Sequence, residues 1–224
     1  ANGHTIDSVR LGELLLPWGQ ENFRAFPWRT TVNSYRILMS EVMLHRTQAI
    51  QVVPVYRSFM MTYPDTAVLA NASLRELQDA LFSLGLRWRI DLIHRMASEI
   101  MIKWGGHIPV ERADLLSLPG VSEYIAGAVR CFAWNLPEPL ADTNTIRIIG
   151  RLFGLETRDS SRRSSRFRTL LNSLIHFDEP RRYNYALLDL ADGVCTKKRP
   201  PDCHLCPLQS LCQTGISWVA ERPS

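Results

Sequence analysis

Four of the five cysteines fall in one short segment near the C-terminus, and their spacing is typical of a metal site. Seven, two and five residues separate them, in the order Cys195, Cys203, Cys206 and Cys212. Four thiolates so close together suit zinc or a 4Fe–4S cluster. Zinc ribbons usually carry two C-x-x-C pairs, and one pair occurs here, which favours iron–sulfur. The odd cysteine total and the lack of a secretory signal argue against disulfides.

Glu41 is the first of two carboxylates whose surroundings could support catalysis. It belongs to a helix predicted over about residues 34–45, with Ser34 as a candidate cap. Ile37, Glu41 and Leu44 share one face of that helix. Burial among apolar neighbours disfavours the charged carboxylate and would raise its pKa. The alternative is an ordinary salt-bridged or edge glutamate.

The second carboxylate, Asp142, ends the stretch 118–144. This stretch begins with the tight turn Leu118-Pro119-Gly120-Val121-Ser122, continues as a small-residue helix over 123–134, and reaches Asp142 through a proline-broken loop. A glycine-containing turn that opens a helix leaves N–H groups free to hold a phosphate oxygen. Asp142 could cap the helix predicted to run to about residue 153, or face a developing positive charge.

The composition is that of an ordinary globular chain with a mildly basic charge. The chain has 224 residues, 46% of them hydrophobic, and a formal charge of +4. No apolar run reaches the roughly 18 residues of a membrane span. Arginine and lysine cluster at 158–168, 181–182 and 197–199. Solvated faces explain most such clusters, so they favour nucleic-acid binding only weakly.

The elements that must position these residues are all predicted to be helices. Apolar residues recur at helical spacing, and no strand pair, hairpin dipeptide or repeat occurs. We therefore predict an all-α fold of two lobes, residues 30–137 and residues 1–29 with 138–224, with a site in the cleft between them. The predicted helices cover about 7–20, 34–45, 48–63, 73–84, 87–104, 111–116, 123–134, 142–153, 166–177 and 181–192.

Taken together, several motifs carry a family likeness. They are Phe26-Pro27-Trp28-Arg29, Ser40-Glu41-Val42-Met43-Leu44, Leu118-Pro119-Gly120-Val121, Asp142-Thr143-Asn144 and the cysteine loop. Over about residues 22–213 the chain resembles the helix-hairpin-helix DNA glycosylases of the endonuclease III and MutY superfamily. The resemblance implies a six-helix barrel with a helix-hairpin-helix motif, and an iron–sulfur domain formed by both termini around a structural 4Fe–4S cluster. It also implies that the target nucleotide flips out of the DNA duplex into the protein.

The resemblance assigns roles to three catalytic candidates. Asp142 matches the aspartate that stabilises an oxocarbenium-like sugar cation. Glu41 matches the glutamate that assists departure of the base or positions water. Tyr124 stands where bifunctional members carry a lysine nucleophile, and a phenol cannot form a Schiff base. The alternative for Tyr124 is a helix residue that only packs.

Residues expected to contact DNA follow from the same resemblance. They are Arg46, Gln48, Leu86, Gly120, Ser122, Asn144, Lys197 and Lys198. Leu86 would act as a wedge beside the flipped base, with packing after a helix as the alternative. Two features depart from the family: Ser122 replaces a glycine, with a strain cost if its φ is positive, and the first cysteine interval is seven residues rather than six.

These positions predict a monofunctional glycosylase of base excision repair that removes thymine or uracil opposite guanine and leaves an abasic site. Tyr124, His45-Arg46, Gly85-Leu86 and the chain's end at 224 resemble the thymine–DNA mismatch glycosylase branch. A MutY-like adenine glycosylase is the alternative, and a non-catalytic iron–sulfur DNA-binding module is the alternative of another class. The expected partner is double-stranded DNA with a mismatched or damaged base. We expect a monomer, no membrane, and a cytoplasmic, nucleoid-associated location, or a nuclear one in a eukaryote.

Overall fold

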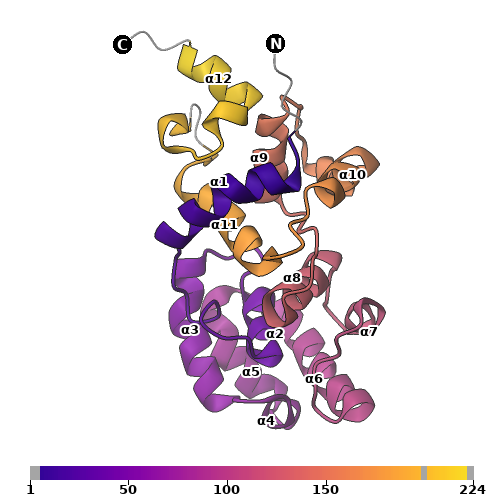
Figure 1. Cartoon of the computed structure of the whole chain (residues 1–224). Coiled ribbons are helices and arrows are strands. Elements are labelled where there is room, and N and C mark those ends of the chain that lie inside the picture. The colour runs from indigo at the N-terminus through magenta and orange to yellow at the C-terminus, as the bar shows by residue number, and fades with distance from the viewer. Residues whose placement is uncertain (1–5, 198–200, 221–224) are drawn as a thin grey trace. The chain divides into compact units, whose positions relative to one another are not determined.

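The computed structural model describes residues 6–197 and 201–220, and all regular elements in this part of the chain are helices (Figure 1). The predicted all-α class is therefore confirmed. None of the described helices combines the length and apolar character needed to cross a membrane.

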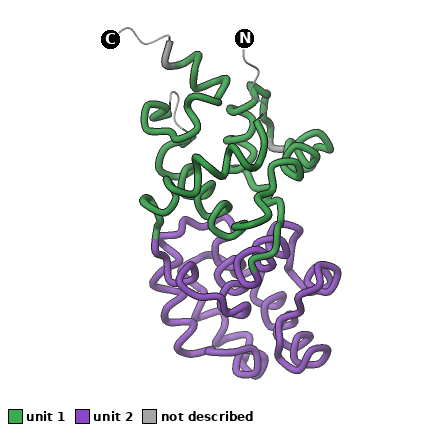
Figure 2. Tube along the Cα trace, in the orientation of Figure 1, with its two compact units in different colours: residues 1–24, 135–224 green, residues 25–134 purple. Residues whose placement is uncertain are grey.

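The chain divides into two compact units (Figure 2). Unit 2 comprises Ala25–Trp134, and unit 1 comprises Ala1–Arg24 together with Asn135–Ser224. Unit 1 is thus built from both ends of the sequence.

The elements of unit 2 follow one another with short connections. They are α2 (Ser34–Met43), α3 (Ala49–Thr62), α4 (Thr66–Ala70), α5 (Leu74–Leu81), the 3₁₀ turns η1 (Phe82–Leu84) and η2 (Arg87–Arg89), α6 (Ile90–Trp104), α7 (Arg112–Ser117) and α8 (Glu123–Trp134). The sequence predicted neither α4 nor the 3₁₀ turns as separate elements. All three are short, and their apolar residues do not extend far enough to show a helical period.

Unit 2 is organised around α2. Eight of the ten residues of α2 are buried. Its neighbour is α8, whose buried side chains include Ala126, Gly127 and Ala128. Small side chains let two helices approach closely, so the larger residues of α2 fill the space between them. Polar groups on such a helix need a partner, and Ser40 donates its hydroxyl to the Ile37 carbonyl at 2.7 Å.

Local capping signals set several helix ends in unit 2. Asn33, rather than the expected Ser34, caps α2, because its side chain accepts a hydrogen bond from the Arg36 amide. Ser73 and Glu76 form the predicted capping box of α5. Gly85, at φ 65°, has the predicted left-handed conformation.

Unit 1 contains α1 (Ser8–Glu21), α9 (Thr143–Leu152), η3 (Asp159–Arg163), α10 (Ser165–Ser173), α11 (Pro180–Gly193), η4 (Cys203–Leu205), η5 (Gln209–Leu211) and α12 (Gln213–Ala220). Leu11 and Leu15 of α1 are fully buried in a core shared with α9, α10 and α11. The N-terminal helix is therefore part of the same core as the helices near the C-terminus.

Helices α1 and α11 cross at a glycine. A Cβ added to Gly19 would lie 2.5 Å from the Cβ of Ala186. This is closer than two carbon atoms can approach, so the crossing requires glycine at position 19.

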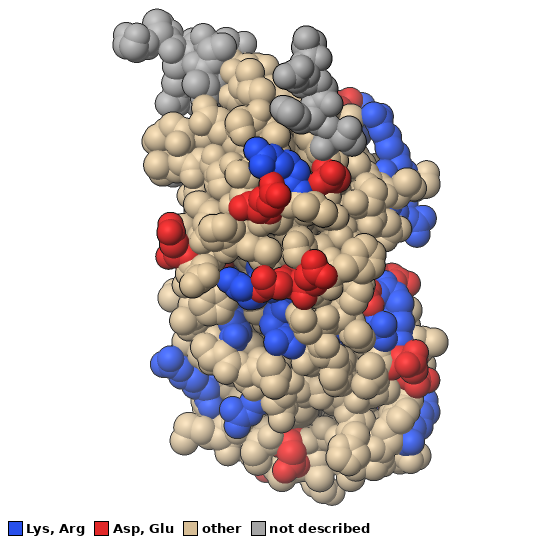
Figure 3. All heavy atoms as spheres, viewed as in Figure 1, with Lys and Arg blue, Asp and Glu red and all other residues tan. Residues whose placement is uncertain are grey.

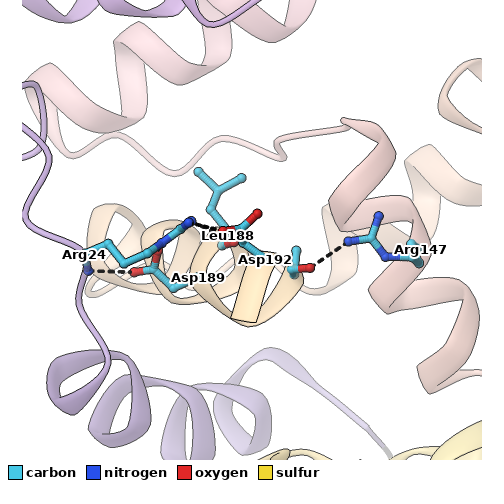
Figure 4. Close-up of polar contacts among 6 residues, drawn as sticks. Arg24, Arg147, Leu188, Asp189 and Asp192 are labelled. Carbon is cyan, nitrogen blue, oxygen red and sulfur yellow. Dashed lines mark hydrogen bonds and ion pairs between the residues drawn. The ribbon is translucent and has the colours of Figure 1, made fainter. Parts of the chain in front are cut away.

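An ion-pair network joins the end of this N-terminal segment to α11 (Figure 4). Arg24 donates from Nε to Oδ1 of Asp189 at 2.6 Å and also pairs with Asp192. Asp189 is 3% exposed, and the Arg24 side chain also reaches the Leu188 carbonyl. A buried carboxylate is tolerated when it is paired in this way, so Arg24 fixes the chain where it leaves unit 1.

We expect Gly19→Ala to lower the free energy of unfolding by about 1–2 kcal/mol, because overpacking costs about 1–3 kcal/mol and the better helix propensity of alanine returns only about 0.5–1 kcal/mol. Gly193→Ala is the matched control, since a Cβ there meets nothing within 4 Å. The control should be neutral or stabilising in urea denaturation. Equal effects of the two substitutions would contradict the close crossing.

Candidate functional site

Glu41 lies on the buried face of α2 and is only 5% exposed. The helical spacing expected from the sequence is present, since α2 contains Ile37 and ends one residue before Leu44. A carboxyl group in such surroundings is chemically distinct from a surface glutamate, because the cost of charging it depends on the few groups around it.

The Pro119–Gly120 turn adopts the conformation that the sequence motif predicts. Gly120 has φ 80°, and a Cβ there would lie 3.3 Å from the Leu92 Cβ. The turn is followed directly by α8, and the Gly120 residue is exposed. The turn thus places an exposed glycine directly before the N-terminus of α8, the end of a helix that favours anions.

Ser122 does not carry the strain that was considered for it. Among described residues other than glycine, only Arg46 and Asn135 have positive φ. The Ser122 hydroxyl accepts a hydrogen bond from the Ile125 amide at 3.3 Å, and its carbonyl accepts one from the Ala126 amide. Ser122 thus occupies the N-cap position of α8, for which serine is well suited.

Tyr124 lies in the first turn of α8, directly after this cap, and is partly buried. A small cavity nearby is lined by Pro119, Gly120, Val42 and Arg89, among others. The Pro119–Gly120 turn therefore lies near the end of α2, because it shares this cavity with Val42, the residue that directly follows Glu41.

The loop that follows α2 contains two exposed side chains expected to contact DNA. Arg46 has φ 63°, an uncommon conformation for a residue other than glycine. Gln48 stands at the N-cap position of α3, but its side chain makes no capping hydrogen bond. Both polar groups face solvent at the end of the helix that carries Glu41.

Leu86 is packed in the core in this structure, and its role as a wedge in DNA stays a prediction. It is 3% exposed, whereas its neighbour Trp88 is 60% exposed. Taking a buried leucine side chain out of the core costs about 1.5–3 kcal/mol. The large apolar side chains exposed on the segment 82–89 are Phe82 and Trp88.

Asp142 caps α9 through its carboxylate. Oδ1 accepts hydrogen bonds from the Thr145 amide at 2.7 Å and from the Thr145 hydroxyl at 2.8 Å. Oδ2 accepts from Nδ2 of Asn144 at 2.9 Å. The capping role predicted for Asp142 is confirmed, and three donors hold its carboxylate in one orientation.

Arg147 connects Asn144 to the cysteine segment. Its Nη1 donates to Oδ1 of Asn144 at 3.1 Å, and its Nε donates to the Cys195 carbonyl at 2.9 Å. Nη2 donates to the Ala191 carbonyl at the end of α11, also at 2.9 Å (Figure 4). Burial is the main cause that lowers the pKa of this guanidinium. Two side chains, Asn144 and Arg147, thus link the Asp142 carboxylate to the backbone of the first cysteine.

The four C-terminal cysteines line one cavity, together with Arg151, Gly215 and Trp218. A Cβ added to Gly215 would lie 3.3 Å from Sγ of Cys212 and 3.8 Å from Sγ of Cys203. No three His, Cys, Asp or Glu side chains of the described residues are placed to bind a single metal ion. The cysteines instead surround a space that the absence of a side chain at Gly215 keeps open.

The donors around these thiols fit a thiolate-bound group. Arg151 donates from Nη1 to Sγ of Cys195 at 3.3 Å, and the Gly215 amide donates to Sγ of Cys212 at 3.2 Å. Burial, with a smaller contribution from the other three cysteines, raises the pKa of the Cys206 thiol to about 12. Four thiolates here would therefore need a cationic centre to balance their charge.

The basic residues near the C-terminus are partly neutralised. Arg158 pairs with Glu156, and Arg182 pairs with Glu179. Figure 3 shows cationic and anionic side chains intermixed on the face in view. Lys197 is exposed, and Lys198 lies outside the described residues.

Sequence reasoning missed Arg89, Arg147 and Arg151. Arg147 and Arg151 lie one helical turn apart on α9, a spacing that puts both on the face of Asn144, and this signal was available. Arg89 gave no signal, because it alternates with apolar residues as Arg87 does and only the tertiary fold buries it.

The fold, the glycine turn before α8 and the carboxylate that caps α9 define a helix-hairpin-helix protein. The family model for HhH-GPD superfamily base excision DNA repair proteins matches residues 39–172. The chain belongs to this family, and the resemblance inferred from the motifs is confirmed.

Known relatives and solved structures agree with this assignment. The chain is 36% identical over 210 residues to a thymine/uracil-DNA glycosylase of Pyrobaculum aerophilum, covering 91% of this chain and 90% of the relative. It is 34% identical to an adenine DNA glycosylase of Rattus norvegicus, covering 89% of this chain but 40% of that protein. The structure of a thermostable thymine-DNA glycosylase matches with a TM-score of 0.86 at 28% identity, covering 93% of this chain and 96% of that one.

Proposed function

We propose that this protein is a monofunctional DNA glycosylase that removes thymine or uracil paired with guanine and leaves an abasic site. The single observation that carries the choice of base is the end-to-end match to a thymine/uracil-DNA glycosylase. The partner is double-stranded DNA that contains the mismatch, and the protein acts as a monomer.

The proposed reaction breaks the bond between the base nitrogen and C1′ of the sugar. The base leaves with the bonding electrons and gains a proton, while water adds to C1′ and loses one. Asp142, held by its three donors, faces the positive charge that develops on the sugar. Glu41, buried on α2, assists departure of the base or positions the water.

Tyr124 supports base release without strand cleavage. Cleavage through a Schiff base needs an amine nucleophile, and a phenol supplies none. The assignment as a glycosylase without lyase activity rests on this residue in the first turn of α8.

The substrate is tested by single-turnover release from duplexes that contain G:T, G:U, A:G or A:8-oxoguanine. We expect thymine and uracil to be released. Adenine release alone would support the second candidate, an adenine glycosylase, which the match to the rat enzyme favours. Tight binding without any release would identify a non-catalytic DNA-binding module.

In the same assay, Glu41→Gln and Asp142→Asn should each lower the rate at least about 100-fold, the scale on which single electrostatic groups contribute. Asparagine is also a good N-cap, so Asp142→Asn should fold normally. Asp65→Asn is the matched control, because Asp65 caps α4 in the same way. Unchanged release by the Asp142 variant would reject its catalytic role.

The hairpin is proposed to hold the DNA backbone through the amides around Gly120 and Ser122, with Arg46, Gln48, Asn144, Lys197 and Lys198 as further contacts. We expect Gly120→Ala to weaken duplex binding at least about 10-fold, because the added Cβ strains the turn that presents these amides. Gly105→Ala introduces the same left-handed strain at φ 60°, at the end of α6 and in open space. In an electrophoretic mobility-shift assay, Gly120→Ala should bind the duplex more weakly than Gly105→Ala. An equal loss of binding by both variants would show that backbone strain alone explains the effect.

The cysteine cavity is proposed to hold a 4Fe–4S cluster bound by Cys195, Cys203, Cys206 and Cys212, which would cross-link the segment after α11 to α12. We expect a brown protein with about four iron atoms and four sulfides per chain. Cys206→Ser should lower iron content and thermal stability, whereas Cys131→Ser, outside the cavity, should keep the iron. A colourless protein with one zinc would contradict the cluster.

A further inference from the structure

The segment 82–89 presents two large aromatic side chains to solvent. Phe82 is 58% exposed and Trp88 is 60% exposed. A guanidinium lies over each ring: that of Arg87 at 4.9 Å from the Phe82 ring centroid, and that of Arg89 at 4.6 Å from the Trp88 ring centroid. Aromatic rings interleaved with arginines are typical of surfaces that stack nucleic-acid bases.

The two rings differ in how firmly they are held. Arg89, behind Trp88, is 5% exposed, and its Nη1 donates to the Val42 carbonyl at 3.2 Å. The His45 ring meets Trp88 edge-on, with centroids 6.2 Å apart. Arg87, over Phe82, is itself exposed. Trp88 is therefore supported by a buried arginine and remains open to solvent, whereas the arginine over the Phe82 ring is itself exposed.

The support also ties Trp88 to the proposed catalytic helix. Val42 directly follows Glu41, so the hydrogen bond from Arg89 sets the position of the indole relative to this part of α2. Arg46, in the loop after α2, lies close enough to Arg89 to lower the pKa of its guanidinium, after the larger effect of burial. An anionic strand passing this surface would be favoured by the charge of Arg46 and Arg87.

We propose that Trp88, rather than Leu86, is the side chain that stacks on a base beside the position vacated when the target nucleotide leaves the duplex. Leu86 is 3% exposed and would have to leave the core to reach DNA, whereas the indole is already outside it. A ring fixed in advance loses little conformational freedom on binding. The assignment rests on the proposed function only in requiring that the protein binds DNA with one nucleotide displaced.

The test uses the full chain and a duplex with a tetrahydrofuran abasic analogue opposite guanine, compared with the same duplex undamaged. Trp88→Ala should weaken binding to the abasic duplex roughly 10- to 100-fold, the range for loss of one base–aromatic stack. Binding to the undamaged duplex should change less than about 3-fold. Trp88→Phe should keep most of the affinity, because a smaller ring still stacks.

Phe82→Ala and Leu86→Ala are the comparison variants. Phe82→Ala should bind like the unmodified protein, since Phe82 is about as exposed as Trp88 but the arginine over its ring is exposed rather than buried. A second readout is 2-aminopurine placed next to the abasic position: its fluorescence should be quenched on binding by the unmodified protein and by Phe82→Ala, but not by Trp88→Ala.

Three outcomes overturn the assignment. The first is that Trp88→Ala binds the abasic duplex normally. The second is that Trp88→Ala weakens binding to both duplexes equally. The third is that Leu86→Ala, with a normal circular dichroism spectrum, is the variant that loses binding and quenching. Because the analogue has no base to remove, none of these depends on which base the enzyme excises. An unmodified protein that binds neither duplex would instead overturn the proposed function, and this assignment with it.

Discussion

The last turn of α11 is the point on which unit 1 depends, because two arginines from distant parts of the sequence bind there. Arg24 approaches with the N-terminal segment and pairs with the buried Asp189 (Figure 4). Arg147 approaches from α9 and donates to the Ala191 carbonyl and, beyond the helix, to the Cys195 carbonyl. Carbonyls at a helix C-terminus lack partners within the helix, and cations are favoured there.

The C-terminal end of α11 therefore has several structural roles. It closes a core to which both ends of the chain contribute, and it fixes the start of the cysteine segment. Through Asn144 it also orients the Asp142 carboxylate, which caps α9 at the same time. A continuous set of hydrogen bonds therefore links the Cys195 carbonyl to the Asp142 carboxylate through Arg147 and Asn144.

Local signals made part of this structure predictable. The capping box of Ser73 and Glu76, the left-handed Gly85 and the cap at Asp142 each depend on residues within one turn, so the sequence alone identifies them. The all-α class followed from the helical period of the apolar residues. The motifs around Glu41, Gly120 and the cysteines were sufficient to recognise the family.

Other features depend on contacts between distant residues, which a single sequence does not reveal. Leu86 and Trp88 are both apolar and two residues apart, and only the packing of the 3₁₀ turn decides which one is buried. The sequence alone suggests that Arg89 is a surface residue, but the structure places its guanidinium against the Val42 carbonyl. The strain considered for Ser122 came from assuming a second positive φ, whereas the turn needs one, at Gly120.

The backbone conformation of Arg46 determines which substitutions at position 46 would stabilise the protein. At φ 63° a residue with a side chain is strained by roughly 1 kcal/mol, and glycine would relieve that strain. The most stable residue at this position is therefore not the one present. Selection for stability alone would therefore favour glycine at position 46. Redesign for stability alone would tend to remove the arginine that is proposed to contact DNA.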